Sequence, residues 1–349
     1  MRLLRVLLGA VLVALAAAGA AGFAVYRQLA TFRETPFGTD DEKVIEIPSG
    51  ASPHQVVRLL ARGGALADER LAWRYLRWWK RDPRALRAGE YAFAGALRPD
   101  EVLEKVYRSE VKTHQFTVPE GLRMEEIAAI IEQAGLGRAS ELVPLMHDPA
   151  FARELRVPFP NLEGYLFPDT YTFTKGPRAR AVLAAMVARF KDEWKKADAD
   201  RLPGVTLDEK QAVTLASIVE KETGRPEERP RIACVFHNRL RRGMRLQTDP
   251  TVMYATMLRH GGQWSQNISK ADLLAPHPYN TYAVAGLPPG PIANPGAAAL
   301  HAALHPSPCS DIFFVSRNDG THVFCPDLRC HEAAVQKWQV DFHRIRRRG

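Results

Sequence analysis

A glutamate near the end of a predicted helix has the best setting for acid–base chemistry. The residues 214–223 read Thr-Leu-Ala-Ser-Ile-Val-Glu-Lys-Glu-Thr. At about 100° per residue, the apolar residues among them form one narrow face. Glu222 falls in the middle of that face, and Glu220 points away from it. Apolar surroundings disfavour an ionised carboxyl and raise its pKa, as a general acid requires. The same position also suits a structural glutamate that meets an arginine.

Two later segments, 245–251 and 279–282, are dense in amides, hydroxyls and aromatic rings. Sugars are bound by such groups, with rings against the sugar face and amides on the hydroxyls. The same residue types also stabilise turns through bonds to their own backbone. We therefore expect a polar site around Glu222 to draw on residues from these segments: Gln247, Asp249, Tyr279, Asn280, Thr281 and Tyr282.

Other chemistries are disfavoured by the motifs that the sequence lacks. There is no phosphate-binding Gly-x4-Gly-Lys-Ser/Thr segment and no Gly-x-Ser-x-Gly nucleophile elbow. Cys325, Cys330, His331 and His322 do not have the spacing of a common zinc site, so we expect no metal and no cofactor.

The four cysteines are too few for a disulfide-built scaffold. Cys234 lies between Ile232 and Val235 in a predicted helix, which favours a buried small apolar residue. Cys325 or Cys330 is expected to pair with the other or with Cys309, which would leave one unpaired thiol.

The elements that must position these residues follow from periodicity. Helices are predicted over about 179–195, 207–223 and 229–241, and an irregular Pro- and Gly-rich stretch over 275–295. Residues 311–315 and 322–324 predict a hairpin closed by Asn318-Asp-Gly320. With a chain of 349 residues, the pattern predicts about two domains of the α+β class.

The N-terminal part contains a repeat. Residues 44–64 and 115–135 both read as a strand, a Pro-x-Gly turn and a helix, and 91–103 echo them weakly. Each unit is too small to bury its own apolar face, so we expect the units to pack on each other. Chance similarity of a turn–helix signal is the alternative.

A basic helix is predicted between these units. Arg70, Arg74, Arg77 and Arg81 form one stripe beside an apolar stripe that includes Trp78 and Trp79. This pattern fits a solvated face over a core face, or a helix that faces a membrane surface or a glycan.

The first residues predict a membrane span. No charged residue occurs from Val6 to Tyr26, a run of 21 residues, whereas about 20 are needed to cross a bilayer. Arg2 and Arg5 precede the run and favour a cytoplasmic N-terminus. A cleaved signal peptide is the alternative, because residues 16–21 offer small-residue cleavage sites. Either way, the rest of the chain is expected to lie outside the cytoplasm.

The net charge of +9 at first suggests nucleic acid, a membrane surface or an acidic polymer as partner. However, residues 1–30 carry +3, residues 70–87 carry +6 and Arg344–Arg348 carry +4, so the remainder carries −4. The positive charge thus lies near the predicted anchor, in the basic helix and at the tail. This distribution favours anionic lipid headgroups and disfavours nucleic acid.

Five ordered motifs carry a family resemblance. They are Asn161-Leu-Glu-Gly-Tyr-Leu-Phe-Pro-Asp-Thr-Tyr171, Leu215-Ala-Ser-Ile-Val-Glu-Lys-Glu-Thr223, Asn238-Arg-Leu-Arg-Arg-Gly-Met-Arg-Leu-Gln-Thr-Asp-Pro-Thr251, Tyr279-Asn-Thr-Tyr282 and Gly286-Leu-Pro-Pro-Gly-Pro-Ile292. With them, the chain resembles the endolytic murein transglycosylases of the YceG-like family. Cys309, Cys325 and Cys330 depart from the family pattern.

The resemblance implies a single-pass inner-membrane protein, with an anchor region (1–42), a LysM-like subdomain (43–112) and a periplasmic catalytic domain (113–349). It implies cleavage of the MurNAc–GlcNAc bond of nascent peptidoglycan without water, which leaves 1,6-anhydroMurNAc ends and terminates strand elongation. Peptidoglycan synthases are possible partners.

The resemblance makes Glu222 the catalytic acid and base, with Glu220 as the fallback. The expected glycan contacts are Glu163, Glu220, Gln247, Asp249, Tyr279, Asn280 and Tyr282. One alternative is a muramidase in which Asp249 or Glu163 assists a water molecule. The other is a non-catalytic peptidoglycan-binding scaffold.

Overall fold

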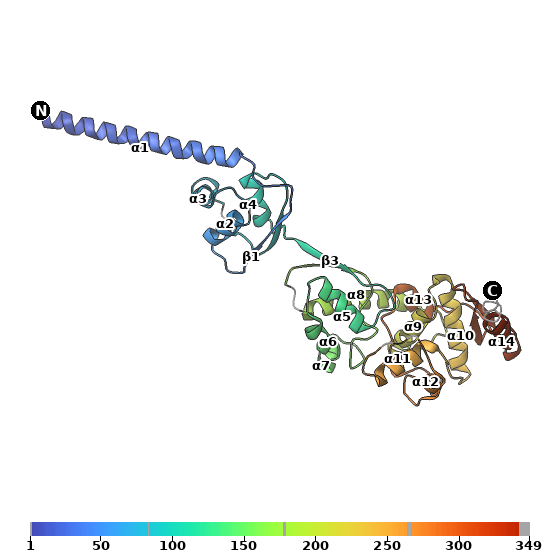
Figure 1. Cartoon of the computed structure of the whole chain (residues 1–349). Helices are drawn as coiled ribbons and strands as arrows, with labels where there is room; N and C mark the ends of the chain where they lie inside the picture. The colour runs from blue at the N-terminus through green and yellow to red at the C-terminus, as the bar shows by residue number, and fades with distance from the viewer. Residues whose placement is uncertain (1, 83, 177–178, 264, 266, 342–349) are drawn as a thin grey trace. The chain divides into compact units, whose positions relative to one another are not determined.

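The structure is a computed structural model that describes residues 2–82, 84–176, 179–263, 265 and 267–341. The chain forms two compact units, residues 1–114 with 173–175, and residues 115–172 with 176–349 (Figure 1). Following the expectation above, we call them the N-terminal unit and the catalytic unit. Helices and short two-stranded sheets make a mixed α+β fold, as the sequence predicted. The basic tail Arg344–Arg348 lies outside the described residues.

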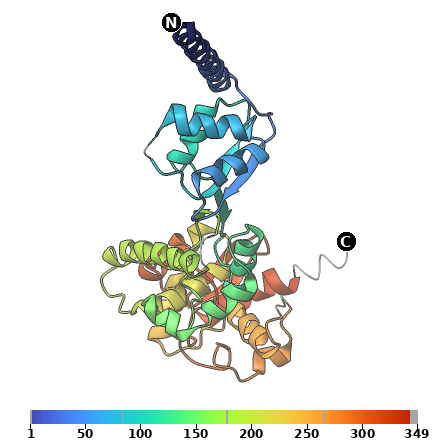
Figure 2. The same ribbon diagram turned by 90° about the vertical axis from the view of Figure 1, so that its left-hand side faces the viewer.

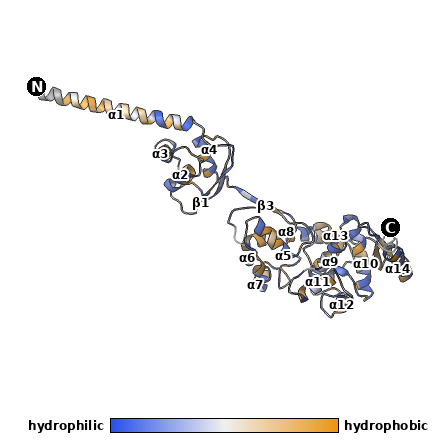
Figure 3. Cartoon of the chain, in the orientation of Figure 1, coloured by the Kyte–Doolittle hydropathy of each residue, from blue (hydrophilic) through white to orange (hydrophobic). Residues whose placement is uncertain are grey.

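The first helix, α1 (Arg2–Glu34), is a single long helix (Figure 2). Its most apolar window has a mean hydropathy of 2.2, and it is long and apolar enough to cross a membrane. Apolar residues follow most of its length in Figure 3. The side chains of residues 7–24 are exposed, whereas Leu29 and Phe32, near its C-terminal end, are buried in the core of the N-terminal unit.

The rest of the N-terminal unit has a β–α–α–β order followed by one more helix. Its elements are β1 (Lys43–Ile47), α2 (Pro53–Arg62), α3 (Glu69–Arg74), the π-helix η1 (Tyr75–Lys80), β2 (Gly89–Phe93) and α4 (Pro99–Tyr107). Strands β1 and β2 pair antiparallel, with Ile45 opposite Tyr91. Ser52 caps α2 through a reciprocal bond with Gln55, which fixes where the helix begins.

The three strand–helix units of the sequence all form, but the two similar ones do not pair with each other. Strand β1 of the first unit pairs with β2 of the weak third echo, whereas β3 (Thr113–Thr117) of the second unit pairs with β4 (Thr170–Thr174). The helix after β3 is α5 (Met124–Gln133), which belongs to the catalytic unit. The first unit and the third echo therefore pack on each other as expected, whereas the strand of the second unit pairs with a strand outside the repeat.

The remaining elements of the catalytic unit are mostly helices. They are α6 (Ala139–Met146), α7 (Pro149–Glu154), α8 (Ala179–Ala199), α9 (Glu209–Glu222), the 3-10 helix η2 (Pro226–Glu228), α10 (Arg229–Arg241), α11 (Asp249–Arg259), α12 (Lys270–Leu274) and α13 (Ala297–Leu304). The predicted helices over 179–195, 207–223 and 229–241 are thereby confirmed. Helix α9 packs against α10, α11 and α13, and every residue from Ala212 to Glu220 is buried. It is the central helix of the unit.

The chain ends in a small lobe. It consists of the predicted hairpin, β5 (Phe313–Ser316) with β6 (His322–Cys325), then α14 (Leu328–Val335) and the π-helix η3 (Gln336–Asp341). Asn318 and Gly320 both have positive φ (63° and 85°) in the turn, which explains why Asn and Gly stand there.

Two disulfides, Cys234–Cys309 and Cys325–Cys330, hold the chain. The second joins the end of β6 to α14. The first corrects two of our expectations, because Cys234 is bonded to a distant loop and no thiol is left unpaired. An apolar helical position gave no sign of a partner 75 residues away.

Candidate active site

A cavity of about 390 Å³ opens at the C-terminal end of α9. Six separate segments of the catalytic unit contribute to its wall, and three of the predicted glycan contacts are among them. The lining residues are Glu222, Arg239, Leu246, Gln247, Asp249, Tyr282, Phe313, Phe314 and His331. The sequence therefore identified four of these residues as site candidates.

Glu222 is the last residue of α9 and faces this cavity. The helix begins at a capping box between Asp208 and Gln211 and ends at Thr223, whose backbone is extended. Burial raises the pKa of the Glu222 carboxyl to about 7, helped by the nearby charge of Asp249 and partly offset by the Thr248 hydroxyl and by Arg239. Near neutral pH the carboxyl is therefore divided between its acid and its base form, as the helical pattern predicted.

Asp249 and Tyr282 form a hydrogen-bonded pair in the cavity wall. The Tyr282 hydroxyl donates to Oδ1 of Asp249 over 2.7 Å. Asp249 is the first residue of α11, where the positive end of the helix dipole favours a carboxylate. The pair thus gives the site a second, ordered acidic group beside Glu222.

Gln247 lies in the loop that leads into α11, and its backbone is held in a left-handed conformation with φ of 49°. The backbone N–H of Gln247 donates to the carbonyl of Thr281 over 3.2 Å. The Thr281 hydroxyl accepts from the backbone N–H of Thr248 over 3.1 Å and meets the Thr251 hydroxyl at 2.8 Å. These bonds join the two polar segments of the sequence into one wall.

Arg239 of α10 ties this wall to the C-terminal lobe. Its Nε donates to the carbonyl of Ile312 over 2.7 Å, and its Nη1 donates to that of Leu246 over 2.5 Å. The side chain is 6% exposed. The buried guanidinium has carbonyl partners in both parts of the wall, so it holds the loop before α11 against the C-terminal lobe.

The part of the wall that the C-terminal lobe supplies is aromatic, and the sequence did not lead us to expect these residues in the site. Phe313 and Phe314 come from β5, and His331 comes from α14. The rings of Phe313 and His331 stack with centroids 4.7 Å apart. Burial lowers the pKa of His331, which keeps its ring neutral near pH 7. We had considered His331 only as a metal ligand, although the aromatic hairpin next to it was a usable signal.

Glu220 lies apart from this cavity. Its Oε1 accepts from Arg229 over 2.6 Å, and its Oε2 accepts from the backbone N–H of Gly296 over 3.0 Å, at the start of α13. Both carboxylate oxygens are thus committed to structure. Because α9 is buried on all sides, a residue that points away from its apolar face still meets protein, and the expected glycan contact at Glu220 is not supported.

Glu163 is also structural. It is 1% exposed, accepts from the backbone N–H of Met124 over 3.2 Å and from the Asn294 amide over 2.9 Å, and contacts the Tyr254 hydroxyl at 3.5 Å. Burial raises its pKa to about 8. It does not line the cavity around Glu222, so the geometry offers it neither a glycan contact nor the water-assisting role of the muramidase alternative.

Tyr279 and Asn280 hold their own loop. The Asn280 amide donates to three backbone carbonyls near the end of α12, and its oxygen accepts from the backbone N–H of Tyr282. The Tyr279 ring packs 4.9 Å from that of Tyr254. The turn role of these residue types therefore applies to Asn280, which holds the backbone of Tyr282, and neither Tyr279 nor Asn280 lines the cavity around Glu222.

The residues considered for zinc are engaged elsewhere. Cys325 and Cys330 are joined in a disulfide, which leaves neither as a thiolate ligand. The Nδ1 of His322 lies 2.6 Å from a carboxylate oxygen of Glu228. These contacts give each side chain a structural role.

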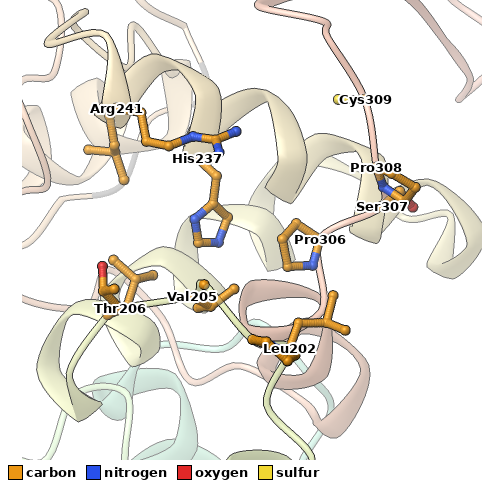
Figure 4. A pocket seen from close by; sticks show the side chains of 13 residues that line it. Leu202, Val205, Thr206, His237, Arg241, Pro306, Ser307, Pro308 and Cys309 are labelled. Atoms are coloured by element: carbon orange, nitrogen blue, oxygen red, sulfur yellow. The ribbon is translucent and has the colours of Figure 1, made fainter.

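A second hollow of about 590 Å³ lies on another side of α10, which supplies His237 and Arg241 to it (Figure 4). Its described lining includes Leu202, Pro306 and Cys309 but no carboxylic acid. Nε2 of His237 lies 2.8 Å from the carbonyl oxygen of Ala303. Burial lowers the pKa of the His237 ring. This hollow thus lacks the acid that the cavity around Glu222 has.

Comparison with known proteins agrees with the motifs. The model of the YceG-like family matches residues 45–337. A Bacillus subtilis protein named endolytic murein transglycosylase is 31% identical over 84% of this chain and 84% of its own length. A Streptococcus pneumoniae protein of the same name is 26% identical, and the match covers 80% of this chain and 56% of that protein.

A solved structure is also similar. The crystal structure of a yceG-like protein from Listeria monocytogenes has 30% identity and a TM-score of 0.53, and the match covers 84% of this chain and 99% of that one. With a family match over most of its length and a relative above 30% identity, the chain belongs to the YceG-like family.

Proposed function

We propose that the chain is a membrane-anchored lytic transglycosylase that cleaves the MurNAc–GlcNAc bond within peptidoglycan strands and leaves 1,6-anhydroMurNAc ends. The observation that carries this proposal is the half-buried carboxyl of Glu222 in the wall of an open polar cavity, with a pKa that desolvation raises to about 7. Relatives named endolytic murein transglycosylase support the substrate and the reaction.

In this reaction, protonated Glu222 first donates its proton to the glycosidic oxygen, and the bond from that oxygen to C1 of the muramic residue breaks. The resulting carboxylate of Glu222 then takes the proton of the muramic 6-hydroxyl, and the oxygen of that hydroxyl forms a bond to C1. The proton is returned to Glu222 and no water is consumed. A pKa near the working pH suits both halves of this cycle.

The neighbouring groups have separate tasks in this scheme. The Asp249 carboxylate, oriented by Tyr282, stabilises the positive charge that develops at C1. Gln247 and the aromatic wall of Phe313 and His331 bind the sugar hydroxyls and faces. A muramidase would instead need Asp249 to activate water, and the products separate the two reactions.

The setting of the enzyme follows from the N-terminal unit and the disulfides. Helix α1 can cross a membrane, and Arg2 and Arg5 favour a cytoplasmic start. Two disulfides fit an oxidising compartment, and we place the catalytic unit in the periplasm. The β–α–α–β order of the N-terminal unit supports a LysM-like subdomain that binds the strand. Cleavage near the membrane would terminate strands as peptidoglycan synthases make them.

The test is product analysis of glycan strands digested by the full-length wild type, by Glu222→Gln and by the control Glu227→Gln, which changes an exposed glutamate. We expect 1,6-anhydro ends from the wild type and the control, and none from Glu222→Gln. Reducing ends in place of anhydro ends would establish a muramidase. Full cleavage by Glu222→Gln would refute the assigned acid, and binding without cleavage by the wild type would establish a scaffold.

A further inference from the structure

The basic helix of the N-terminal unit packs directly against α1. The ring of Trp79, in η1, stacks on that of Tyr26 in α1 with centroids 5.2 Å apart. The ring of Tyr75 lies 5.8 Å from that of Phe32, which follows Tyr26 by six residues along α1. Leu71 of α3 and Phe23 of α1 line one shared hollow. The segment α3–η1 thus lies alongside the C-terminal turns of α1.

Tyr26 marks the edge of the apolar span. The uncharged run ends at this residue and has 21 members, which at about 1.5 Å per residue spans about 31 Å, the thickness of the hydrocarbon core. Tyr26 therefore reaches the level where the bilayer meets water, a level that Tyr and Trp favour. Its contact with Trp79 places η1 at that same level.

The face of this segment that the protein leaves open is basic and aromatic. Arg70, Arg74, Arg77 and Arg81 are exposed, and among the described residues none of the four forms an ion pair. By contrast, nearby Lys80 and Arg84 are paired with acidic residues. The face therefore keeps four positive charges available for an outside partner.

Trp78 belongs to the same face, and 51% of it is exposed. Burying so large an apolar side chain at an interface removes apolar surface from water and is favourable. A tryptophan among unpaired arginines is the composition of an interfacial segment that binds anionic lipid.

We propose that the face formed by Arg70, Arg74, Arg77, Trp78 and Arg81 binds the anionic phospholipid headgroups of the leaflet where α1 leaves the membrane. It rests on the anchoring role proposed for α1. The glycan strand is the rival partner for this face. The stack of Trp79 on Tyr26 favours lipid, because the face is continuous with the span itself.

The test uses the full-length chain in nanodiscs of phosphatidylcholine, with or without about a third of phosphatidylglycerol. Tryptophan fluorescence is compared between lipids with plain and with brominated acyl chains, which quench rings that they contact. The chain has six tryptophans, so contact by Trp78 and Trp79 should lower the fluorescence by roughly a sixth to a third. Trp78→Phe should lose part of this quenching.

The charges are tested by Arg70→Gln/Arg74→Gln/Arg77→Gln. This variant should lose the extra quenching that phosphatidylglycerol gives, as should the wild type in about 1 M salt. The matched control is Arg153→Gln/Lys195→Gln/Arg242→Gln, which removes three exposed charges from the catalytic unit and should behave like the wild type.

Four outcomes would overturn the inference. A chain that enters nanodiscs and cleaves glycan but shows no quenching would refute the lipid contact and leave the proposed function intact. Equal quenching in Trp78→Phe and wild type would assign the signal to other rings. The glycan would be the partner if soluble glycan fragments change the fluorescence of the wild type but not of the triple arginine variant, and lipid changes neither. A chain that stays outside the nanodiscs would refute the anchor itself.

Discussion

Replacing Glu222 with Gln should stabilise the catalytic unit above neutral pH while it abolishes cleavage. Burial raises the pKa of this carboxyl from 4.5 to about 7. Between these two values the folded chain holds a proton that the unfolded chain has released. The free energy of unfolding therefore falls as the pH rises through this window. One pKa unit corresponds to about 1.4 kcal/mol, so the loss at pH 8 is at most about 3 kcal/mol.

The assay is denaturant unfolding of full-length wild type and Glu222→Gln in detergent micelles from pH 4.5 to 8. Glu163, whose pKa is also raised, is present in both chains, so its contribution cancels in the difference. We expect nearly equal stability at pH 4.5, and a variant that is more stable by up to about 3 kcal/mol at pH 8.

Glu220→Gln serves as the control. It alters a buried glutamate on the same helix, but it should lower the free energy of unfolding instead of raising it. It weakens the 2.6 Å bond to Arg229 and leaves the guanidinium with Glu120 at 3.2 Å. We expect it to be less stable than wild type by roughly 1–3 kcal/mol. If the difference in unfolding free energy between Glu222→Gln and wild type stays constant from pH 4.5 to 8, or favours the wild type at pH 8, the raised pKa of the Glu222 carboxyl is refuted.

Three further predictions concern the cavity wall. Tyr282→Phe removes the 2.7 Å bond to Asp249. It should lower kcat/KM about tenfold with little change in melting temperature, because in the proposed site this bond orients a charge at the reacting centre. An unchanged kcat/KM would contradict that role. His331→Ala should raise KM more than it lowers kcat in glycan digestion, because in the proposed site its ring contacts sugar and transfers no proton. A loss confined to kcat would contradict this. Cys325→Ser/Cys330→Ser removes a disulfide between residues five apart. The unfolding free energy of the lobe, measured by denaturation without reductant, should fall by about 2 kcal/mol. Equal stability of variant and wild type would show that the bond does not stabilise the lobe.

The elements of the catalytic unit were predictable where one local signal decided them. Periodicity gave α8, α9 and α10, and the Asn318–Gly320 turn gave the hairpin. Glu222 could be selected because its neighbours on α9 are apolar, and the apolar surroundings of a carboxyl are visible in one helix.

The rest depends on contacts between distant segments. Asn280 and Gln247 have similar side chains in similar loops, yet one fastens backbone carbonyls and the other lines the cavity. The pairing of Cys234 with Cys309 and the bond from the backbone N–H of Gly296 to Glu220 likewise join parts of the chain that no spacing relates. A sequence names the residue types of a site, whereas tertiary packing decides which of them face the substrate.

Leu29 and Phe32, the two residues of α1 that lie in the core of the N-terminal unit, have a mechanical consequence. The helix passes from its apolar span into that core without a break, so no hinge separates the two. In a thinner bilayer a span of this length tilts to match the hydrocarbon thickness. The N-terminal unit would tilt with it as one body, and membrane thickness would set the angle at which this unit stands on the surface.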